Sequence, residues 1–364
     1  MSWLLLVLIW LLRSFAILLL AGTVLPFVHT GSWVIRGFDF PRLQLALLCT
    51  GLAVTIAIVG AVGDWRREPW FWMALCLLLA TWHASYVVRF TPVWPVVVPD
   101  SERSDLSLVV ANLDFRNDDR DAAFEVLQNL GADAYLLIEV DQIWLNALAP
   151  LRDALPHRLE AVRDEGLGIV LWSAKPLTDA AIEHLVSESR PSLHATLNVE
   201  GGTVRLVGTH PTPPGLPKQD DDGRHDSRIR DAELMLIAER VVEAPDHDWI
   251  VAGDFNDVAW SRITSMFART SGLLDPRVGR SLLNTYHADY ALLRYPLDHI
   301  FVSQGFKVGA FQRVRIPGSD HFAVQVELQV PRTSTDSTPD ADGVDSKTES
   351  LIQEGQEDAL ESSG

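Results

Sequence analysis

The sequence predicts a mixed α/β domain that follows three membrane-spanning helices. Residues 1–99 contain three long apolar runs, whereas residues 104–330 alternate short apolar runs with helical patterns. The net charge changes sign between the same two parts of the chain. Residues 1–99 carry six arginines and three acids, a net charge of +3, and the whole chain carries −18, so the remainder carries −21. We therefore expect the two parts to lie in different solvents.

The apolar runs cover residues 3–28, 43–62 and 70–88. A membrane-spanning helix needs about 20 mostly apolar residues, and each run meets that length. The alternatives are buried core helices or, for the first run, a cleavable signal peptide. Signal peptides begin with basic residues, which the first three residues here lack. Eight of the twelve tryptophans fall at or before position 94, as expected at membrane interfaces. Residues 1–90 are thus predicted to be a multi-pass region integrated in a lipid bilayer.

The loop charges bear on the orientation of the spans. Arg66 and Arg67 lie between the second and third runs, and the positive-inside rule places such a loop in the cytoplasm. Three spans then put the large C-terminal domain outside the cytoplasm. Arg36, Arg42 and Arg89 argue for the opposite orientation. We predict an extracytoplasmic domain.

Composition also sets the remaining boundaries. Residues 91–103 are rich in proline and predict an extended linker. Residues 331–364 contain nine acids against two basic residues and few large apolar residues, which predicts a disordered acidic tail. The segment 104–330, about 225 residues, is long enough for one two-layer domain. It contains no cysteine, so neither a disulfide framework nor a thiolate site is expected in it.

Within residues 104–330 the pattern predicts more strands than helices. Helices are expected at about 119–130 and 228–242, because apolar residues recur there at helical spacing. Strands are expected at 106–112, 134–138, 168–172, 195–199, 204–210, 249–254, 297–303 and 321–330. The chain shows no internal repeat and no glycine-rich nucleotide-binding loop.

Polar residues stand at the ends of several predicted strands. Strand ends gather at one edge of a sheet, so distant positions can converge on one pocket. The run Val251–Asp257 is the clearest case, since it ends in Asp254 and Asn256, two residues apart and able to reach one ligand. The other members are Asn112, Glu139, His210, Asp298 and the pair Asp320 and His321.

The chemistry of these residues favours a divalent cation. Carboxylate and carboxamide oxygens are the ligands that Mg²⁺ or Mn²⁺ prefers. Zinc would call for more histidine at tighter spacing. His321 beside Asp320 could present an imidazole to a substrate, with Asp298 as its orienting partner. His210 lies in a loop stiffened by prolines, where a phosphate oxygen or a leaving group is a plausible target.

Each residue also has a plainer reading. Glu139 could be an ordinary strand-end acid facing water, and Asn112 could simply form a turn. Asp320 and His321 could form a loop-to-strand turn. Arg228 and Arg230 are expected to solvate a helix face, and His299 is expected to flank the site without entering it.

Taken in order, Asn112, Glu139, His210, the Gly253-Asp254-Phe255-Asn256 motif, Asp298 and the Ser319-Asp320-His321 motif resemble the endonuclease/exonuclease/phosphatase superfamily. The superfamily includes deoxyribonucleases, apurinic endonucleases, neutral sphingomyelinases and inositol polyphosphate phosphatases. The resemblance covers about residues 104–330 and points to a deoxyribonuclease-like, membrane-tethered bacterial member.

This resemblance implies a four-layer α/β/β/α sandwich and metal-dependent hydrolysis of a phosphoester. Glu139 would be the principal metal ligand, with Asn112 and Asp320 near the ion. Asp254 would orient or deprotonate the attacking water, and Asn256 would hold a phosphate oxygen. His321, paired with Asp298, would contact or protonate the phosphoryl group, and His210 would serve the leaving-group side.

Two departures from the family pattern matter. Ile138 stands where many members have glutamine before the metal-binding glutamate. The domain is also acidic, with 22 basic residues against 36 acids over residues 100–330, which argues against tight binding of duplex nucleic acid. The expected partners are therefore a phosphoester substrate, either a nucleic acid or a phospholipid or inositol phosphate, and the bilayer. No obligate protein partner is evident, and the competing reading is a catalytically silent membrane receptor or scaffold of the same fold.

Overall fold

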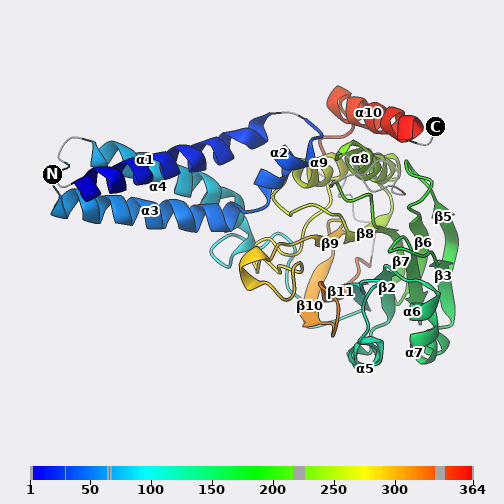
Figure 1. Cartoon of the computed structure of the whole chain (residues 1–364). Helices are drawn as coiled ribbons and strands as arrows, with labels where there is room; N and C mark the ends of the chain where they lie inside the picture. The colour runs from blue at the N-terminus through cyan, green and yellow to red at the C-terminus, as the bar shows by residue number, and fades with distance from the viewer. Residues whose placement is uncertain are drawn as a thin grey trace.

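The computed structural model describes residues 3–28, 30–63, 65, 68–215, 226–332 and 341–362. A bundle of long helices stands at one end of the molecule, and an α/β domain forms the other (Figure 1). Arg66 and Arg67, on which the predicted orientation depends, lie outside the described residues, as does the charged stretch 218–222.

Two mixed sheets form the centre of the domain. The first sheet has the order β10 (Lys307–Arg315), β11 (Phe322–Gln329), β1 (Leu106–Asn112), β2 (Ala134–Ile138), β4 (Ile169–Ser173) and β3 (His157–Ala161). The second has the order β5 (Leu177–Glu183), β6 (Ser192–Val199), β7 (Gly202–Thr209), β8 (Asp248–Asp254) and β9 (Asp298–Val302). Only β1 with β2 and β7 with β8 are parallel among the paired strands.

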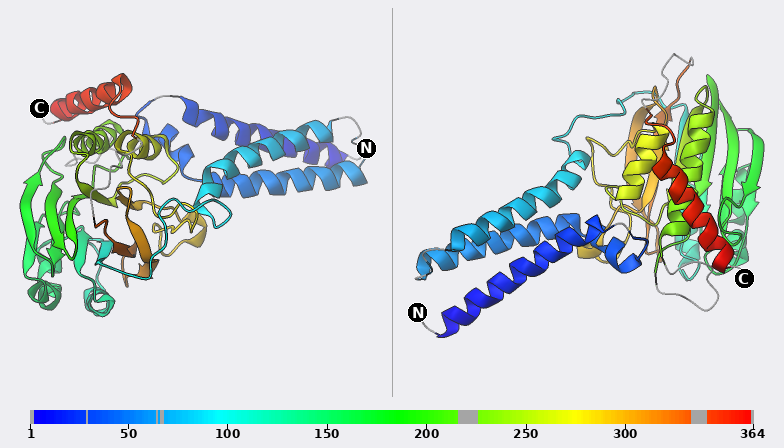
Figure 2. Two further views of the ribbon diagram at one scale, coloured as in Figure 1. Left: turned by 180° about the vertical axis from the view of Figure 1, so that it is seen from behind. Right: turned by 90° about the horizontal axis from the view of Figure 1, so that it is seen from above.

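Helices cover the outer faces of both sheets (Figure 2). The first sheet carries α5 (Arg120–Leu130), α6 (Gln142–Ala147) and α7 (Ala149–Ala154). The second carries α8 (Arg228–Glu243) and α9 (Arg262–Ser271), and α10 (Ser346–Ser362) packs on the outer side of α8. The domain is therefore the predicted four-layer α/β/β/α sandwich.

Strand alternation divides the apolar side chains between inner and outer cores. In β8, Ile250 and Ala252 pack between the two sheets, whereas Val251 packs against the outer helices. In β9, Ile300 faces the inner core and Phe301 the outer core. Asp254 and Asp298 continue the inner series, so their carboxylates point towards the end of the space between the sheets.

In the part of the chain that the structure describes, three helices are long and apolar enough to cross a membrane, as predicted: α1 (Trp3–Val24) with η1 (Leu25–Phe27), α3 (Arg42–Val62), and α4 (Pro69–Val87) with η3 (Val88–Phe90). Small residues pack along the bundle axis, among them Ala16, Cys49 and Cys76. Most of the outward-facing leucines, valines and isoleucines are exposed, as expected for a surface that meets lipid.

The short connection between α1 and α3 contacts the domain. It contains α2 (Trp33–Arg36) and η2 (Gly37–Asp39). The indole Nε1 of Trp260 donates a hydrogen bond of 2.8 Å to the Asp39 carbonyl. Residues 91–105 form no helix or longer strand and lie along the domain, where Ser101 N donates to the Val308 carbonyl at 2.8 Å.

The acidic tail differs from its prediction as a disordered segment. Residues 346–362 form α10, which packs on α8. Leu351, Gly355 and Ala359 recur every four residues, and a Cβ on Gly355 would lie 2.5 Å from the Arg228 carbonyl oxygen. Asp358 forms an ion pair of 2.9 Å with Arg228. Because so few large apolar residues occur in this tail, its composition alone did not indicate a packed helix.

Candidate active site

The topology of the two sheets explains why distant polar residues meet. β1, β2, β7 and β8 end at the same edge of the sandwich, and their antiparallel neighbours β9 and β11 begin there. A cavity of about 650 Å³ opens at this edge. It is lined by seven of the eight predicted site residues: Asn112, Glu139, His210, Asp254, Asn256, Asp320 and His321. The eighth, Asp298, lies directly behind His321.

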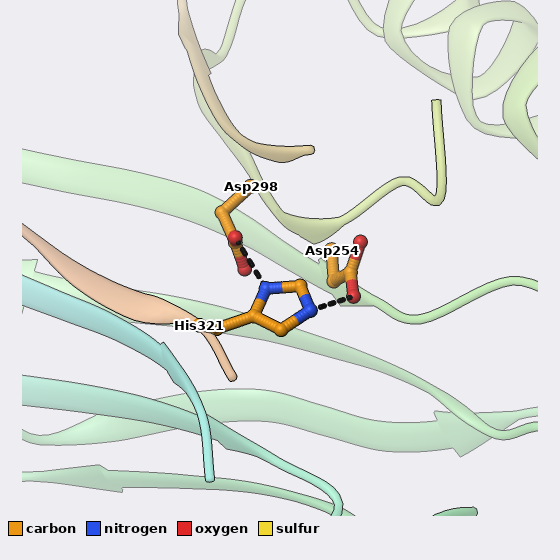
Figure 3. A group of neighbouring side chains, drawn as sticks. All are labelled: Asp254, Asp298 and His321. Carbon is orange, nitrogen blue, oxygen red and sulfur yellow. Dashed lines mark hydrogen bonds and ion pairs between the residues drawn. The ribbon is translucent and has the colours of Figure 1, made fainter. Parts of the chain in front are cut away.

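Asp298, His321 and Asp254 form a buried row (Figure 3). The Nδ1 atom of His321 lies 2.8 Å from Asp298 Oδ2, and its Nε2 atom lies 3.7 Å from Asp254 Oδ2. The backbone N–H of His321 donates to Ser319 Oγ at 3.0 Å. The imidazole is thus fixed between two carboxylates, with Nε2 turned towards the cavity that Asp254 lines.

These neighbours shift the protonation equilibria of the row. Burial lowers the pKa of His321, but the charges of Asp298 and Asp254 outweigh it and raise that pKa to about 10. Burial raises the pKa of Asp254 to about 7, with His321 opposing and Asp298 adding to the rise. A carboxylate with a pKa near neutrality is suited to exchange a proton with water.

Glu139 lies on the other side of Asn112. The Asn112 Nδ2 group donates to Glu139 Oε1 at 3.1 Å and to Asp254 Oδ2 at 3.2 Å, while its Oδ1 accepts the Asp114 N–H. Asn112 therefore bridges the two carboxylates through its amide nitrogen. Glu139 Oε2 also accepts the Phe115 N–H at 3.2 Å, and burial raises the pKa of Glu139 against both hydrogen bonds.

Unusual backbone conformations aim these side chains. Three residues have positive φ angles: 64° at Glu139, 52° at Asn256 and 146° at Gly253. A Cβ atom on Gly253 would lie only 1.8 Å from the Thr209 carbonyl oxygen. A side chain at position 253 is excluded for that reason.

Asn256 reaches the cavity by a route that differs from the one predicted. β8 ends at Asp254, so the two residues do not share a strand face. Asn256 instead follows a turn in which its N–H donates to Asp254 Oδ1 at 2.9 Å, and its Nδ2 donates to the Pro211 carbonyl at 3.0 Å.

His210 follows β7 and is almost fully buried. Its Nε2 atom lies 3.9 Å from Asp254 Oδ2, and its Nδ1 lies 3.5 Å from an Arg190 nitrogen. Burial, Arg190 and His321 hold the pKa of His210 well below its usual value. His210 is therefore a neutral imidazole at physiological pH. Behind it, Thr209 Oγ1 donates to Glu233 Oε1 at 2.5 Å, and burial raises the pKa of Glu233 to about 7.

The donor set fits a divalent cation. Asp254, Asp298 and His321 offer ligand atoms within 4.8 Å of one another, and the Glu139 carboxylate is linked to Asp254 through Asn112. Asp298 Oδ1 is buried without a hydrogen-bond partner. Buried carboxylates with raised pKa values indicate a site that lacks compensating positive charge.

Several residues of the cavity were not predicted from the sequence. Phe40 comes from the connection between α1 and α3, Arg190 from the loop before β6, and Tyr286 from the loop before β9. The Tyr286 ring lies 4.9 Å from the His321 ring. No sequence motif marks these positions, because only the fold brings them to the site.

A second buried polar cluster lies beside the cavity and includes Asp257. An Arg230 nitrogen lies 3.1 Å from Asp257 Oδ2, and an Arg36 nitrogen lies 3.6 Å from the same atom. Arg230 also donates to the Asn256 carbonyl at 2.8 Å. Arg230 is thus buried rather than solvating a helix face, which corrects the prediction. His299 does flank the site: it faces the outer core, stacks on Phe255 and lies 2.6 Å from an Arg277 nitrogen.

Comparison with known proteins bears on the family and the fold of this domain. Residues 109–321, more than half of the chain, match the model of the Endonuclease/Exonuclease/phosphatase family. No curated protein matches the sequence.

Solved structures resemble the domain. TDP2 of D. rerio, complexed with a single-strand DNA product, is 16% identical with a TM-score of 0.51, covering 63% of this chain and 100% of that one. A protein of the family from Beutenbergia cavernae is 20% identical with a TM-score of 0.49, covering 63% and 72%. Sphingomyelinase C of Streptomyces griseocarneus is 16% identical with a TM-score of 0.45, covering 62% and 99%.

Proposed function

Because this chain belongs to the endonuclease/exonuclease/phosphatase family, we propose that it is a membrane-anchored hydrolase of phosphoester bonds, most suited to phosphodiesters, that depends on Mg²⁺ or Mn²⁺. The observation that carries the proposal is the buried row Asp254, His321 and Asp298 beside Glu139. A binding module has no need for a histidine fixed between two acids, so the silent receptor or scaffold is the weaker reading.

In this proposal Glu139 is the principal ligand of the cation, with Asp320 beside it. Asn112 keeps the Glu139 and Asp254 carboxylates together through its amide nitrogen. When bound, the cation supplies positive charge that stabilises the phosphoryl oxygens in the transition state.

The chain's own residues handle the protons. Asp254, whose pKa is raised to about 7, accepts a proton from the attacking water. His321 carries a proton at neutral pH and donates a hydrogen bond from Nε2 to a phosphoryl oxygen, while Asp298 holds its Nδ1. Asn256 orients a second phosphate oxygen, and neutral His210 stands on the side of the leaving group.

The membrane part of the proposal rests on α1, α3 and α4, each long and apolar enough to span a bilayer. We infer three spans with the catalytic domain outside the cytoplasm. The domain is acidic, so a phosphoester that is not part of a nucleic-acid duplex is the better substrate.

The decisive experiment uses the full chain in detergent with a para-nitrophenyl phosphodiester. We expect turnover with Mg²⁺ or Mn²⁺, its loss with a chelator, and its return when the metal is restored. Glu139→Gln should lower turnover about 10³-fold, because a metal ligand contributes several kcal/mol to the transition state. The matched control is Glu125→Gln, since Glu125 is exposed on α5.

Metal binding itself gives a second readout. A cation that binds only the folded protein raises its melting temperature. That rise should appear in the unsubstituted chain and in the control, and be reduced in Glu139→Gln. Turnover that persists with a chelator, or in Glu139→Gln at the control's level, would contradict the assignment.

A further inference from the structure

The loop between α9 and β9 has an apolar tip that the catalytic proposal does not use. In this tip, Tyr290, Leu292 and Leu293 are 61%, 83% and 56% exposed. The tip surrounds the short helix η4 (Ala291–Leu293). Single exposed leucines are common on protein surfaces, but three large apolar side chains within four residues form a patch.

This tip lies beside the domain-side end of the helix bundle. The Gln44 side chain, in the first turn of α3, donates a hydrogen bond of 2.8 Å from Nε2 to the Leu292 carbonyl. The loop's Tyr295 packs edge-on against Phe40, with ring centroids 5.5 Å apart. Both views show the loop, drawn in gold, against the domain-side end of the bundle (Figures 1 and 2).

The lipid-facing surface of α3 continues from this contact. Leu47 and Leu48, in the turn after Gln44, are exposed apolar residues of a candidate membrane span. The exposed side chains of the tip therefore stand at the level where α3 enters its apolar stretch. With α3 in a bilayer, as proposed, a loop at that height would meet the bilayer surface rather than bulk water.

The base of the same loop forms a wall of the catalytic cavity. Tyr286 lines the cavity against His321, and the Ala288 N–H donates to the Asp320 carbonyl at 2.7 Å. Phe40, the residue that holds Tyr295, lines the cavity too. One short loop thus links the catalytic histidine to the end of the membrane bundle.

We propose that Tyr290, Leu292 and Leu293 insert into the surface of the bilayer that holds the helices, and that this contact sets the mouth of the cavity at the lipid surface. The occupant of the patch is the membrane itself, because the patch is continuous with the bundle through Gln44 and Phe40. The inference rests on the proposed function: a cavity held there takes a phosphoester that carries an apolar chain anchored in the same bilayer.

The first test measures insertion without measuring activity. Leu292→Cys in the full chain is labelled with an environment-sensitive fluorophore and placed in phosphatidylcholine nanodiscs. Cys49 and Cys76 are buried in the bundle, so the label goes to the new thiol. We expect lipids brominated in their acyl chains to quench the label at least twofold. The control is Ile143→Cys, because Ile143 is 58% exposed on α6, away from the bundle.

Quenching at position 292 no stronger than at position 143 would overturn the proposal. A label shielded only at high protein density, without quenching by lipid, would also overturn it, since the patch would then contact a second copy. Neither outcome depends on catalysis, so the insertion of the tip can be established or overturned whether or not the proposed function holds.

The second test compares two substrates with one leaving group, methyl and hexadecyl para-nitrophenyl phosphate, the latter carried in the nanodisc. In the double variant Leu292→Asp and Leu293→Asp, we expect the ratio of kcat/KM for the hexadecyl ester to that for the methyl ester to fall about tenfold. An unchanged ratio would overturn the link between the tip and the substrate. Failure of the unsubstituted chain to cleave either ester would count against the proposed function alone.

Discussion

Asp254 and Asp257 are two buried aspartates, three residues apart at the end of one strand, and the charges around them have opposite signs. Their exposed fractions are 1% and 2%. Asp254 has Asp298 and Glu139 nearby, and His321 is its close cation among the residues that the structure describes. Asp257 has two arginines within 4 Å, Arg230 and Arg36.

The contrast extends to the residues behind each aspartate. Behind Asp257, Arg36 and Arg42 pair with Asp39, and Arg230 pairs with Asp231. Positive charge there matches or exceeds negative charge, so these carboxylates are neutralised without a bound cation. Around Asp254 the acids are in surplus, and the pKa of Asp254 rises. A buried acid among acids is poised for chemistry, whereas a buried acid among arginines holds structure.

The sharpest way to break this comparison is to neutralise Asp254. Asp254→Asn should lower kcat about 10³- to 10⁴-fold, because it removes the proposed proton acceptor. It should not lower the melting temperature, since it relieves repulsion with Asp298 and removes a buried charge. Turnover and thermal unfolding of the full chain in detergent measure both effects. A kcat within tenfold of the original would contradict the role of Asp254.

The matched change on the other side of the comparison is Asp257→Asn. It leaves Arg36 and Arg230 buried without their shared carboxylate, so we expect a loss of about 3–5 kcal/mol in the free energy of unfolding. Chemical denaturation of the detergent-solubilised chain measures it. Kcat should fall less than in Asp254→Asn, because Asp257 acts only through the Arg230 contact to the Asn256 carbonyl. If Asp254→Asn proved the more destabilising change, the distinction drawn between the clusters would be wrong.

Glu233 is a third buried acid, and the pH dependence of its contribution to stability extends the comparison. Burial raises its pKa from 4.5 to about 7 although Thr209 and Arg190 oppose the rise. The folded state therefore binds this proton more tightly than the unfolded state. The resulting stability is fully present below pH 4.5 and is lost as the pH rises through about 7.

We expect this loss to be about 3 kcal/mol in the original chain and to be absent in Glu233→Gln. The measurement is the free energy of unfolding at several pH values across that interval, compared between the two proteins. Parallel pH profiles would show that Glu233 is not the titrating group.

Sequence patterns predicted the parts of the fold whose signals are local. β1 and β2 have the predicted bounds, because each is an apolar run closed by a polar residue. β5 and β10 were missed, since they are sheet-edge strands rich in exposed and polar residues. α9 was missed as well, although its apolar residues Ile263, Met266 and Phe267 recur at helical spacing.

The same limit applies to the site. The polar residues at strand ends could be grouped into one predicted site, because strand ends meet at one edge of a sheet. The resemblance to the family then suggested a role for each of them. Arg36 and Asp257 could not be paired, because they are far apart in the chain and an arginine near a predicted membrane span is commonplace. Tyr286 and Phe40 likewise enter the cavity only through tertiary packing.

The hydrogen bond from Trp260 to the Asp39 carbonyl and the ion pair of Arg36 with Asp257 have a mechanical consequence. These two contacts hold the connection between α1 and α3 against the domain, so they restrict rotation of the domain relative to its helices. With the helices in a bilayer, as proposed, the cavity stays at one distance from the membrane surface and in one orientation to it. The search for substrate then becomes two-dimensional, by lateral travel and rotation of the whole molecule in the membrane plane.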